Sequence, residues 1–577
     1  MAQQQDEQMQ NEQPQGNKRA LIIILPALIA GLATVLAAVI GEEDAAPQEN
    51  DRTYAVAERG MVSSATSYAT EAGLEILEAG GNAFDAFVAT AAALNVTEPA
   101  MSGVGGYGTI VLWDAGEGRA HFLNSSGLIP RRVDSDAYRA PTPGYMENRR
   151  GAKAVSTPGN AAAWESMWER FGSMEWADLF EPAIRLAEEG VVLDGRFASL
   201  IGWAFDSFPD HARAIYGRDG VPLQQGERFI QADLGRSLRM IAEQGAQALH
   251  GGELGEAVDR AMREAGGFLR LDDLAENEAE WYDPISIDYR GYEVVTAPPP
   301  ANSFPALVRL GMMSLYDNRA SGHNSAEFLH RFCEVTKHGF WTRLRFASDP
   351  LVAPVPLGML LSEEYWQEQV GTIEPDRARP FEYPDVIPPE GMNTTHFVVA
   401  DRFGNIVSAT QTLGNGFGSR IMPEGTGFWL NNSLAYCTFE PKGNPMDAFP
   451  GRHKLSGDVP ILIIREGRPW VALGTPGGHT IGQTVPQMVM NLIDFDMDVL
   501  AAIAAPRISF VEPDVIVLED GIDGAVVRTL RSYGHNIRTG GGLGLAHGLA
   551  IEYNRRGRPV RFMGAADWRG AGLAKGY

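Results

Sequence analysis

The stretch GMNTTHFVVADRFGNIVSATQTLGNGFGSR, residues 391–420, contains two strand-like runs with a turn between them. Apolar and polar residues alternate in residues 394–399, and threonine favours strands, which predicts a half-buried strand. Residues 401–405 have the composition of a tight turn, and residues 406–410 begin a second strand. The stretch therefore predicts a β-hairpin whose first strand begins with two threonines.

Thr394, at the start of this hairpin, also fits a catalytic role. A threonine hydroxyl becomes a nucleophile when the free α-amino group of the same residue acts as its base. That arrangement requires cleavage of the bond between Asn393 and Thr394. The preceding residues 373–393 are rich in proline and pair poorly in a sheet, so they can be displaced once they are cut. Two interpretations stay open, a structural threonine or the nucleophile of a self-cleaving precursor.

A nucleophile of this kind needs donors for the negative charge that develops on the substrate oxygen. The segment GTPGGHT, residues 474–480, contains Gly477 and Gly478, whose consecutive backbone amides no side chain obstructs. His396 and His479 are not paired with a nucleophile motif such as G-x-S-x-G, so we interpret both as structural.

The composition argues against several classes of function. The 577 residues include 73 acidic and 48 basic residues, and the formal net charge of −25 repels phosphate backbones, so we expect no nucleic acid partner. Cys333 and Cys437 lack the spacing of a metal site or a disulfide framework, although a single bridge between them stays open. The segment GVGGYG, residues 103–108, matches a dinucleotide fingerprint, but a predicted helix precedes it instead of a strand. We therefore expect neither cofactor nor metal.

The first residues of the chain have the pattern of an export signal. Residues 1–19 are polar, rich in glutamine and end in Lys18-Arg19, which predicts a disordered cytoplasmic tail. Residues 20–41 are uncharged and long enough to cross a bilayer of about 30 Å. A cleaved signal peptide is the alternative, although its apolar region is usually shorter. We expect a membrane-anchored protein whose catalytic part is periplasmic or extracellular, or a secreted protein if the segment is cleaved.

The remaining chain alternates between helical and strand-like regions. Apolar spacing predicts several helical regions before residue 391, and short Val/Ile/Thr runs separated by glycine turns predict strands after it. Such a mixture indicates a layered α/β or α+β fold. The predicted helical regions are 67–96, with a break at Gly80-Gly81, 160–190, 232–265, 324–347 and 481–493.

Motifs along residues 52–577 resemble the gamma-glutamyltransferase family of N-terminal threonine nucleophile hydrolases. In chain order they are GMVSS (60–64), ILEAGGNAFDA (76–86), STPGN (156–160), DYRGYEVVTAPPP (288–300), TTHFVVADRFGNIVSATQT (394–412), GTGFWLNNSLA (425–435), TPGG (475–478) and GAADWRGAGLAKGY at the end. Their number and order make the resemblance specific.

The resemblance implies a four-layer αββα sandwich formed by a large subunit, residues 52–393, and a small subunit, residues 394–577. The two fragments of this zymogen would stay associated as a heterodimer. Thr394 would perform the autocatalytic cleavage and then carry the acyl group, and Thr412 would orient it by a hydrogen bond. Gly477 and Gly478 would form the oxyanion hole.

The resemblance is weakest at the positions that hold the substrate. Where family members that act on glutathione bind the glutamyl α-carboxylate with an arginine, this chain has Ser126, followed later by Arg131 and Arg132. Charged hydrogen bonds are worth about 1.5–3 kcal/mol each, so we expect γ-glutamyl groups to be poor substrates. The other substrate-binding positions implied by the resemblance are Ser456 and Gly457 on the carboxylate side, and Gly414, Ser433 and Tyr436 on the amino side.

Three functional hypotheses follow. The first is an exported, self-processing amide hydrolase or acyltransferase whose acyl specificity differs from γ-glutamyl, acting on small-molecule or peptide-like amides. The second is an ordinary glutathione hydrolase/gamma-glutamyltransferase. The third is a non-catalytic, membrane-tethered family member.

Overall fold

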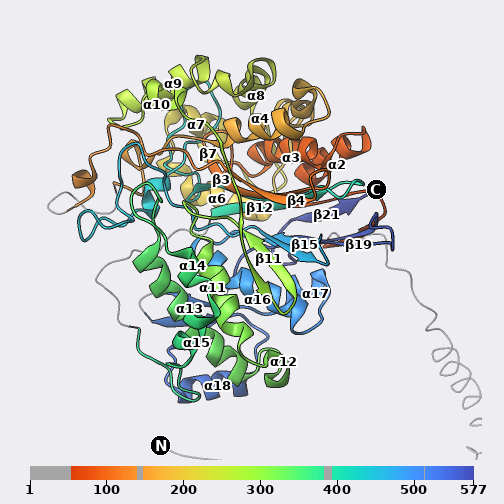
Figure 1. Cartoon of the computed structure of the whole chain (residues 1–577). Helices are drawn as coiled ribbons and strands as arrows, with labels where there is room; N and C mark the ends of the chain where they lie inside the picture. The colour runs from red at the N-terminus through yellow and green to blue at the C-terminus, as the bar shows by residue number, and fades with distance from the viewer. Residues whose placement is uncertain (1–52, 140–146, 382–392, 512–513) are drawn as a thin grey trace, which may run out of the picture. The chain divides into compact units, whose positions relative to one another are not determined.

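Two seven-stranded sheets lie at the centre of the computed structural model, which describes residues 53–139, 147–381, 393–511 and 514–577 (Figure 1). In spatial order the first sheet consists of β21 (Leu573–Gly576), β2 (Met61–Ser64), β12 (Asn393–Ala400), β13 (Ile406–Gly414), β3 (Tyr107–Asp114), β4 (Arg119–Asn124) and β9 (Glu280–Tyr282). The second consists of β1 (Tyr54–Ala57), β20 (Pro559–Ala566), β19 (His547–Tyr553), β15 (Arg468–Gly474), β14 (Ile461–Arg465), β11 (Tyr292–Thr296) and β10 (Ile285–Tyr289).

Alternation along the strands places one face of each sheet against the other. Val398 of β12 and Val111 of β3 belong to the same buried cluster as Leu462, Ala472 and Leu549 of the second sheet. Successive side chains of a strand point to opposite faces, so the neighbours of these residues face away from this layer. The predicted α/β class is confirmed, with the two sheets packed face to face.

Helices cover the outer face of each sheet (Figure 1). The cluster on the first sheet joins Val399 and Val407 to Phe87, and the cluster on the second sheet joins Ile463 to Val485. The helices of the first cover are α2 (Ser67–Glu78), α3 (Ala83–Thr97), α4 (Asn160–Phe171), α5 (Glu181–Glu189), α8 (Ala232–Gln244), α9 (Glu253–Glu264) and α10 (Leu271–Ala275). Those of the second are α11 (Phe304–Ser314), α13 (Ala326–Phe346), α14 (Leu357–Leu360), α15 (Glu363–Val370), α16 (Ile481–Ile493), α17 (Val499–Ala504) and α18 (Gly524–Ser532).

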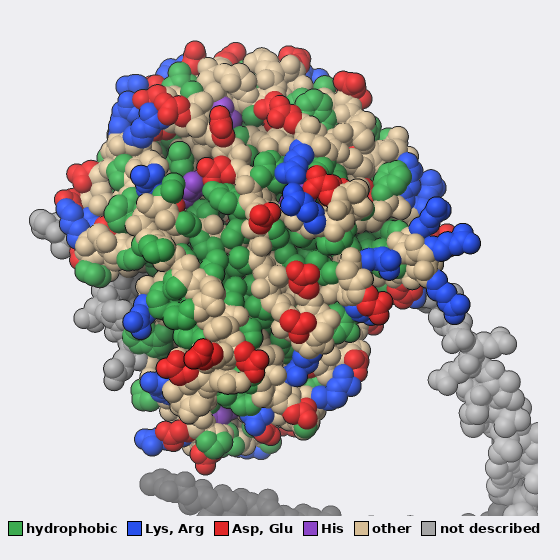
Figure 2. All heavy atoms as spheres, in the orientation of Figure 1, with side chains coloured by type: hydrophobic (Ala, Val, Ile, Leu, Met, Phe, Trp, Pro, Cys, Tyr) green, Lys and Arg blue, Asp and Glu red, His purple; other side chains and the backbone are tan. Residues whose placement is uncertain are grey.

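The remaining elements lie outside these layers. They are α6 (Gly195–Ala204), α7 (Asp210–Tyr216), α12 (Asn318–Ser321), a three-stranded sheet of β16 (Ile508–Val511), β17 (Val515–Leu518) and β18 (Ile537–Thr539), and the short pairs β5 (Val191–Val192) with β8 (Arg228–Phe229) and β6 (Gly217–Arg218) with β7 (Val221–Pro222). On the face in Figure 2, acidic and basic side chains are interspersed, and hydrophobic side chains gather across the middle.

The predicted helices and hairpin agree with the structure, with two refinements. Regions 160–190 and 232–265 each contain two α-helices instead of one. The break predicted at Gly80-Gly81 separates α2 from α3, and Gly80 has a φ of +106°, which a glycine adopts without strain. The proposed segments 1–19 and 20–41 lie outside the described residues. Among the helices of the described part of the chain, none has both the length and the apolar character needed to cross a membrane.

The turn of the central hairpin is held by Asp401, which is 1% exposed. Its Oδ1 accepts hydrogen bonds from the backbone amides of Phe403 (2.8 Å) and Asn405 (3.1 Å). Its Oδ2 accepts from the Ala83 amide at the first residue of α3 (2.9 Å) and from the Asn405 side chain (2.8 Å). One carboxylate therefore joins the hairpin to the helix that covers it.

Replacing Asp401 with Ala should lower the free energy of unfolding by about 2–4 kcal/mol, because several buried donors would lose their acceptor. Asp283→Ala is a matched control, since the Asp283 side chain is 91% exposed. Urea unfolding monitored by fluorescence would measure both variants. Equal unfolding midpoints for the two variants would contradict this role of Asp401.

Candidate active site

Thr394 lies near the start of β12, at an irregularity in its pairing with β13. Asn393 pairs with Gly414 and Thr395 with Gln411, so the register shifts between these two pairs. The Thr394 side chain is buried, and its Oγ1 donates to Oγ1 of Thr412 at 3.2 Å. The predicted contact between the two threonines is present.

The Thr412 hydroxyl connects three groups around the Asn393–Thr394 bond. It accepts from Thr394 and from the Gly414 amide (2.8 Å), and it donates to the Asn393 carbonyl oxygen (2.9 Å). A hydroxyl has one proton and two lone pairs, so these contacts use its full capacity. The arrangement is suited to drawing the Thr394 proton away while polarising the carbonyl next to it.

Gly414 contributes through its backbone. Its φ is +96°, and a Cβ there would lie 2.1 Å from Oδ1 of Asn432, so a side chain is excluded on both grounds. The Gly414 amide can therefore reach Thr412 only with glycine at this position.

Gly477 and Gly478 lie between β15 and α16, with φ values of +142° and +59°. The loop begins beside the candidate nucleophile strand, because a Cβ on Gly474 would lie 2.3 Å from the His396 ring. His396 itself is fully buried, and burial lowers its pKa well below the ordinary value. Its Nδ1 lies 2.9 Å from Oγ1 of Thr410, which fits the structural role predicted for this histidine.

The substrate-binding residues implied by the resemblance differ in the hydrogen bonds that they already make within the protein and in the space around them. The Ser126 hydroxyl is buried and has no hydrogen-bond partner within the described residues. Ser433 bonds to the Ser156 hydroxyl, and its amide donates to Asn431 (3.1 Å). A Cβ at Gly457 would meet nothing within 4 Å, so space is open there.

Ser456 lies beside β3 on the face that carries Thr412. Its hydroxyl donates to Asp458 (2.8 Å) and lies 3.1 Å from Oγ1 of Thr109. The backbone of this segment is fixed as well, because the Asn302 amide donates to the Ser456 carbonyl at 2.6 Å. Ser456 is therefore held in a network that reaches the first sheet.

The sequence did not point to Lys454 as a site residue. Its side chain is 1% exposed, and its Nζ lies 3.6 Å from the centroid of the Tyr107 ring and 4.5 Å from that of Tyr436. Tyr107 is the cross-strand partner of Thr412. The only available signal was the position of Lys454 two residues before Ser456.

Arg131 and Arg132 point to acidic partners instead of the site. Arg132 forms a bidentate pair with Asp272, at 2.8 Å for both contacts, and Arg131 pairs with Glu276. Both arginine side chains are more than 40% exposed. The possibility that they replace the missing arginine is therefore not supported by their positions.

The glycines of GVGGYG have a packing role. A Cβ on Gly105 would lie 2.1 Å from the Trp429 carbonyl oxygen, and a Cβ on Gly106 would lie 2.5 Å from that of Thr412. Residues 103–108 therefore lie directly against the backbone at Thr412 and Trp429, where a side chain would not fit. Cys333 and Cys437, whose pairing was left open, are free thiols.

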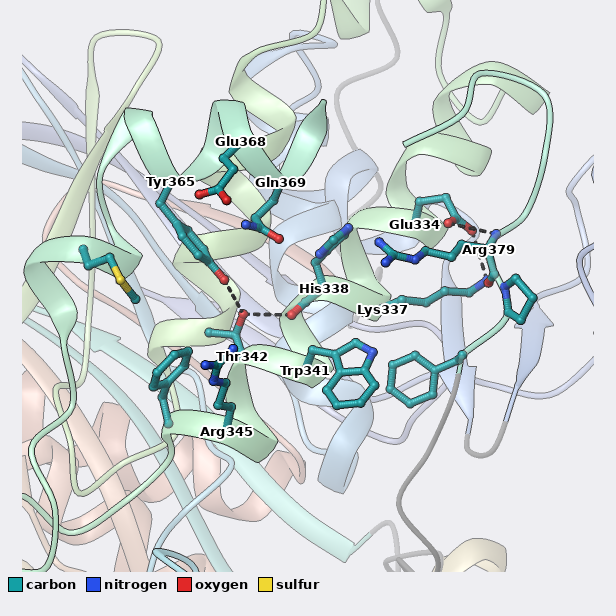
Figure 3. A pocket seen from close by; sticks show the side chains of 14 residues that line it. Glu334, Lys337, His338, Trp341, Thr342, Arg345, Tyr365, Glu368, Gln369 and Arg379 are labelled. Atoms are coloured by element: carbon teal, nitrogen blue, oxygen red, sulfur yellow. Dashed lines mark hydrogen bonds and ion pairs between the residues drawn. The ribbon is translucent and has the colours of Figure 1, made fainter. Parts of the chain in front are cut away.

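A separate hollow lies over α13 and α15 and the segment 379–381 (Figure 3). There the Arg379 amide donates to Glu334 (3.1 Å), and Lys337 donates to the Arg379 carbonyl (2.6 Å). Burial lowers the pKa of His338 to about 4, so this histidine is neutral at pH 7. Thr394 and Thr412 do not line the hollow. The contacts of Glu334 and Lys337 hold Arg379, which precedes the candidate cleavage point in the sequence.

Comparison with known proteins identifies the family of this chain. The sequence profile described as gamma-glutamyltranspeptidase matches residues 69–577. The chain belongs to the gamma-glutamyltranspeptidase family. It is therefore an enzyme of the N-terminal nucleophile type, and its mixed α/β fold is that of solved members of this group.

Relatives of this family member differ in their named activities. The chain is 35% identical over 543 residues to the Acylase ACY 1 proenzyme of Pseudomonas sp. strain V22, covering 90% of this chain and 94% of the relative. It is 30% identical over 541 residues to the Glutathione hydrolase proenzyme of Escherichia coli strain K12, covering 90% and 92%. The solved cephalosporin acylase from Bacillus halodurans matches with a TM-score of 0.83 and 28% identity, over 93% of this chain and 99% of that one.

His453, which follows Thr394 in the sequence, contacts two carboxylates that precede it. Its Nδ1 lies 3.0 Å from Asp349 and its Nε2 lies 3.0 Å from Glu280. Burial disfavours the charged ring, but the hydrogen bonds to the two carboxylates outweigh burial and raise the pKa of His453 to about 9. The charged histidine therefore contributes stability at neutral pH.

This contribution should be complete below pH 6.5, the ordinary pKa of histidine, and should be lost as the pH rises to about 9 and beyond. The loss amounts to at most about 3 kcal/mol. Urea unfolding at a series of pH values should show a steeper decline for the wild type than for His453→Gln. Parallel profiles for the two proteins would exclude the ion pairs as the cause.

Proposed function

We propose that this family member is a self-processing amide hydrolase or acyltransferase in which Thr394 first cleaves the chain and then carries the acyl group. The observation that supports this most is the Thr412 hydroxyl, which contacts both Thr394 Oγ1 (3.2 Å) and the Asn393 carbonyl (2.9 Å). The nucleophile and the bond to be cleaved share one hydrogen-bonding partner.

Processing begins when Thr394 Oγ1 attacks the Asn393 carbonyl carbon. The Thr394 proton passes to Thr412, and the Thr412 proton passes to the carbonyl oxygen, so no charge builds up in the buried site. The C–N bond then breaks, and the α-nitrogen of Thr394 takes up the proton, which leaves Asn393 as an ester on Oγ1. Water hydrolyses this ester to the Asn393 carboxylate and a free Thr394.

In turnover, the new α-amino group of Thr394 is the base for its own hydroxyl. The hydroxyl attacks the substrate amide, and the amides of Gly477 and Gly478 donate to the developing oxyanion. The amine leaves with the proton, and water or an acceptor amine then removes the acyl group from Thr394. The position of Gly477 and Gly478 supports this role, because they follow shortly after β15, whose last residue, Gly474, lies against the His396 ring.

The two products, residues 1–393, which include the large subunit 52–393, and the small subunit of residues 394–577, stay together in this proposal. In the first sheet, β12 pairs with β2 and β13 pairs with β3, so strands of the small fragment lie between strands of the large one. Separating the fragments would expose to water the apolar residues that cover both faces of the sheet. The free-energy cost of this exposure keeps the fragments together after the peptide bond is cleaved.

The acyl group differs from γ-glutamyl. Ser126 stands in place of an arginine, the Ser433 hydroxyl is engaged by Ser156, and Gly414 has no side chain to offer an α-amino group. The 35% identity to an acylase proenzyme supports this choice over an ordinary glutathione hydrolase.

Residues 20–41 anchor the enzyme in the membrane with its catalytic part exported, according to the charge pattern around them. Membrane fractions should then retain the protein after a high-salt wash. Recovery of a soluble form that begins near residues 42–52 would favour a cleaved signal peptide.

Thr394→Ala should abolish self-cleavage, because alanine has no hydroxyl to attack Asn393. A denaturing gel should show one full-length chain for this variant and two fragments for the wild type. Thr395→Ala is the matched control, since Thr395 is equally buried but is the next residue along β12. Cleaved Thr394→Ala protein would exclude this mechanism, and an intact wild-type chain would favour a non-catalytic family member.

The wild type should cleave itself yet hydrolyse a γ-glutamyl anilide with a kcat/KM at least about 10²-fold below that of a glutathione hydrolase measured in parallel. Ser126→Arg alone should not restore activity, because the amino-side contacts at Gly414, Ser433 and Tyr436 would still be absent. Efficient, saturable glutathione hydrolysis by the wild type would refute the altered specificity.

A further inference from the structure

Trp203, the penultimate residue of α6, is held at the surface by a well-packed helix. Phe197 and Ile201 of α6 belong to one buried cluster with Phe417, which follows β13 in the sequence. Trp203 lies outside this cluster and is 58% exposed. Single exposed apolar side chains are common, so the neighbours of this indole ring have to decide its role.

One of these neighbours is Asn393, whose bond to Thr394 is the candidate cleavage point. A Cβ on Gly416 would lie 3.4 Å from Cζ3 of Trp203 and 3.3 Å from Nδ2 of Asn393. The edge of the indole ring and the Asn393 side chain therefore border the same small space. Because Asn393 is bonded to the α-nitrogen of Thr394, this space lies on the side of the nucleophile that carries that nitrogen.

The amine portion of a substrate has to approach the same α-nitrogen during turnover. The Thr394 hydroxyl passes its proton to the α-amino group as Oγ1 attacks the substrate carbonyl carbon. When the substrate C–N bond breaks, the leaving nitrogen takes this proton, the acyl group stays on Oγ1, and the amine departs. Proton transfer requires hydrogen-bonding distance, so the leaving amine lies beside the atom from which Asn393 was cleaved. The rest of the amine is thereby directed toward Trp203.

Arg420 orients the indole ring and determines the charge near it. Its Cζ lies over the ring, 4.5 Å from the centroid, and its guanidinium group donates to the Ser207 hydroxyl. Burial, together with the nearby charge of Arg150, lowers the pKa of Arg420 to about 10, so Arg420 is still charged at pH 7. Two positive charges near the indole ring would repel a cationic amine, whereas a neutral ring can pack against the exposed indole surface.

We propose that Trp203, oriented by Arg420, forms a subsite for the amine portion of the substrate, and that this portion is a planar aromatic group without positive charge. This inference rests on the proposed function. The aromatic group stacks on the exposed indole surface in the space that Asn393 borders before cleavage. Trp203 therefore determines specificity for the leaving amine, independently of the residues that bind the acyl group.

A binding measurement tests the subsite without relying on catalysis. The probe is aminomethylcoumarin, a fluorescent, planar aromatic amine that is neutral at pH 7. Titration followed by fluorescence anisotropy should show an affinity that falls about 3- to 10-fold from the wild type to Trp203→Ala. Trp203→Phe, which keeps an aromatic ring, should retain more of the affinity than Trp203→Ala.

Trp568→Ala is the matched control. Trp568 is 59% exposed and also lies beneath an arginine, since Arg569 Cζ is 4.9 Å from its ring centroid. This variant should bind the coumarin as tightly as the wild type. Equal affinity in the wild type and Trp203→Ala, or no binding by either protein, would refute the subsite.

A kinetic measurement separates a specificity role from a structural one. γ-Glutamyl anilide and γ-glutamyl methylamide have the same acyl group, so the poor fit of that group affects both substrates alike. The ratio of kcat/KM for the anilide to that for the methylamide should fall by at least about threefold in Trp203→Ala and stay constant in Trp568→Ala. If Trp203 only stabilised the fold, both substrates would lose activity together, and an unchanged ratio in Trp203→Ala would overturn the inference.

Failure of the proposed function gives a different result. An uncleaved wild-type chain that hydrolyses neither substrate would refute the function. The coumarin titration would still decide whether Trp203 binds an aromatic amine, because Trp203 is exposed in the uncleaved chain. A cleaved, active enzyme whose coumarin affinity does not depend on Trp203 would refute the subsite alone.

Discussion

The pairing of β12 with both β2 and β13 is the constraint on which the rest of the structure depends. It places Thr394 in the middle of a sheet instead of in a loop, with one face of its strand against the second sheet and the other against α3. Because both faces are covered, every polar group near the start of β12 needs a partner. The Thr412 hydroxyl meets that requirement for Thr394, Asn393 and Gly414 together.

The same constraint explains why so much of the candidate site consists of backbone and small side chains. Gly414, Gly106 and Gly474 each lie so close to neighbouring groups that a Cβ would clash. Close approach brings amides and hydroxyls within hydrogen-bonding distance and leaves little room for water, which strengthens each electrostatic contact. Nearby, the buried Lys454 ammonium group lies over the rings of Tyr107 and Tyr436.

Much of the fold could be predicted from the sequence. The periodicity of 67–96 and 324–347 corresponds to α2, α3 and α13, and the alternation after Thr394 corresponds to the central hairpin, because these patterns reflect contacts between residues that are close in the chain. Motif order was sufficient for the family. The contact between Thr394 and Thr412, which the resemblance implied, is present, and it is a local one because the two strands that carry them are joined by a short turn.

By itself the sequence determined the elements, the family and the candidate nucleophile, because each depends on local pattern or on a motif within one hairpin. The tertiary structure decided where the long cationic side chains lie. Arg131 and Arg132 directly follow the segment that contains Ser126, yet they bind Asp272 and Glu276, whereas Lys454, more than three hundred residues from Ser126, lies over Tyr107. The physical reason is that the direction of a long side chain depends on the burial and charges around it, which are contributed by segments distant in the sequence.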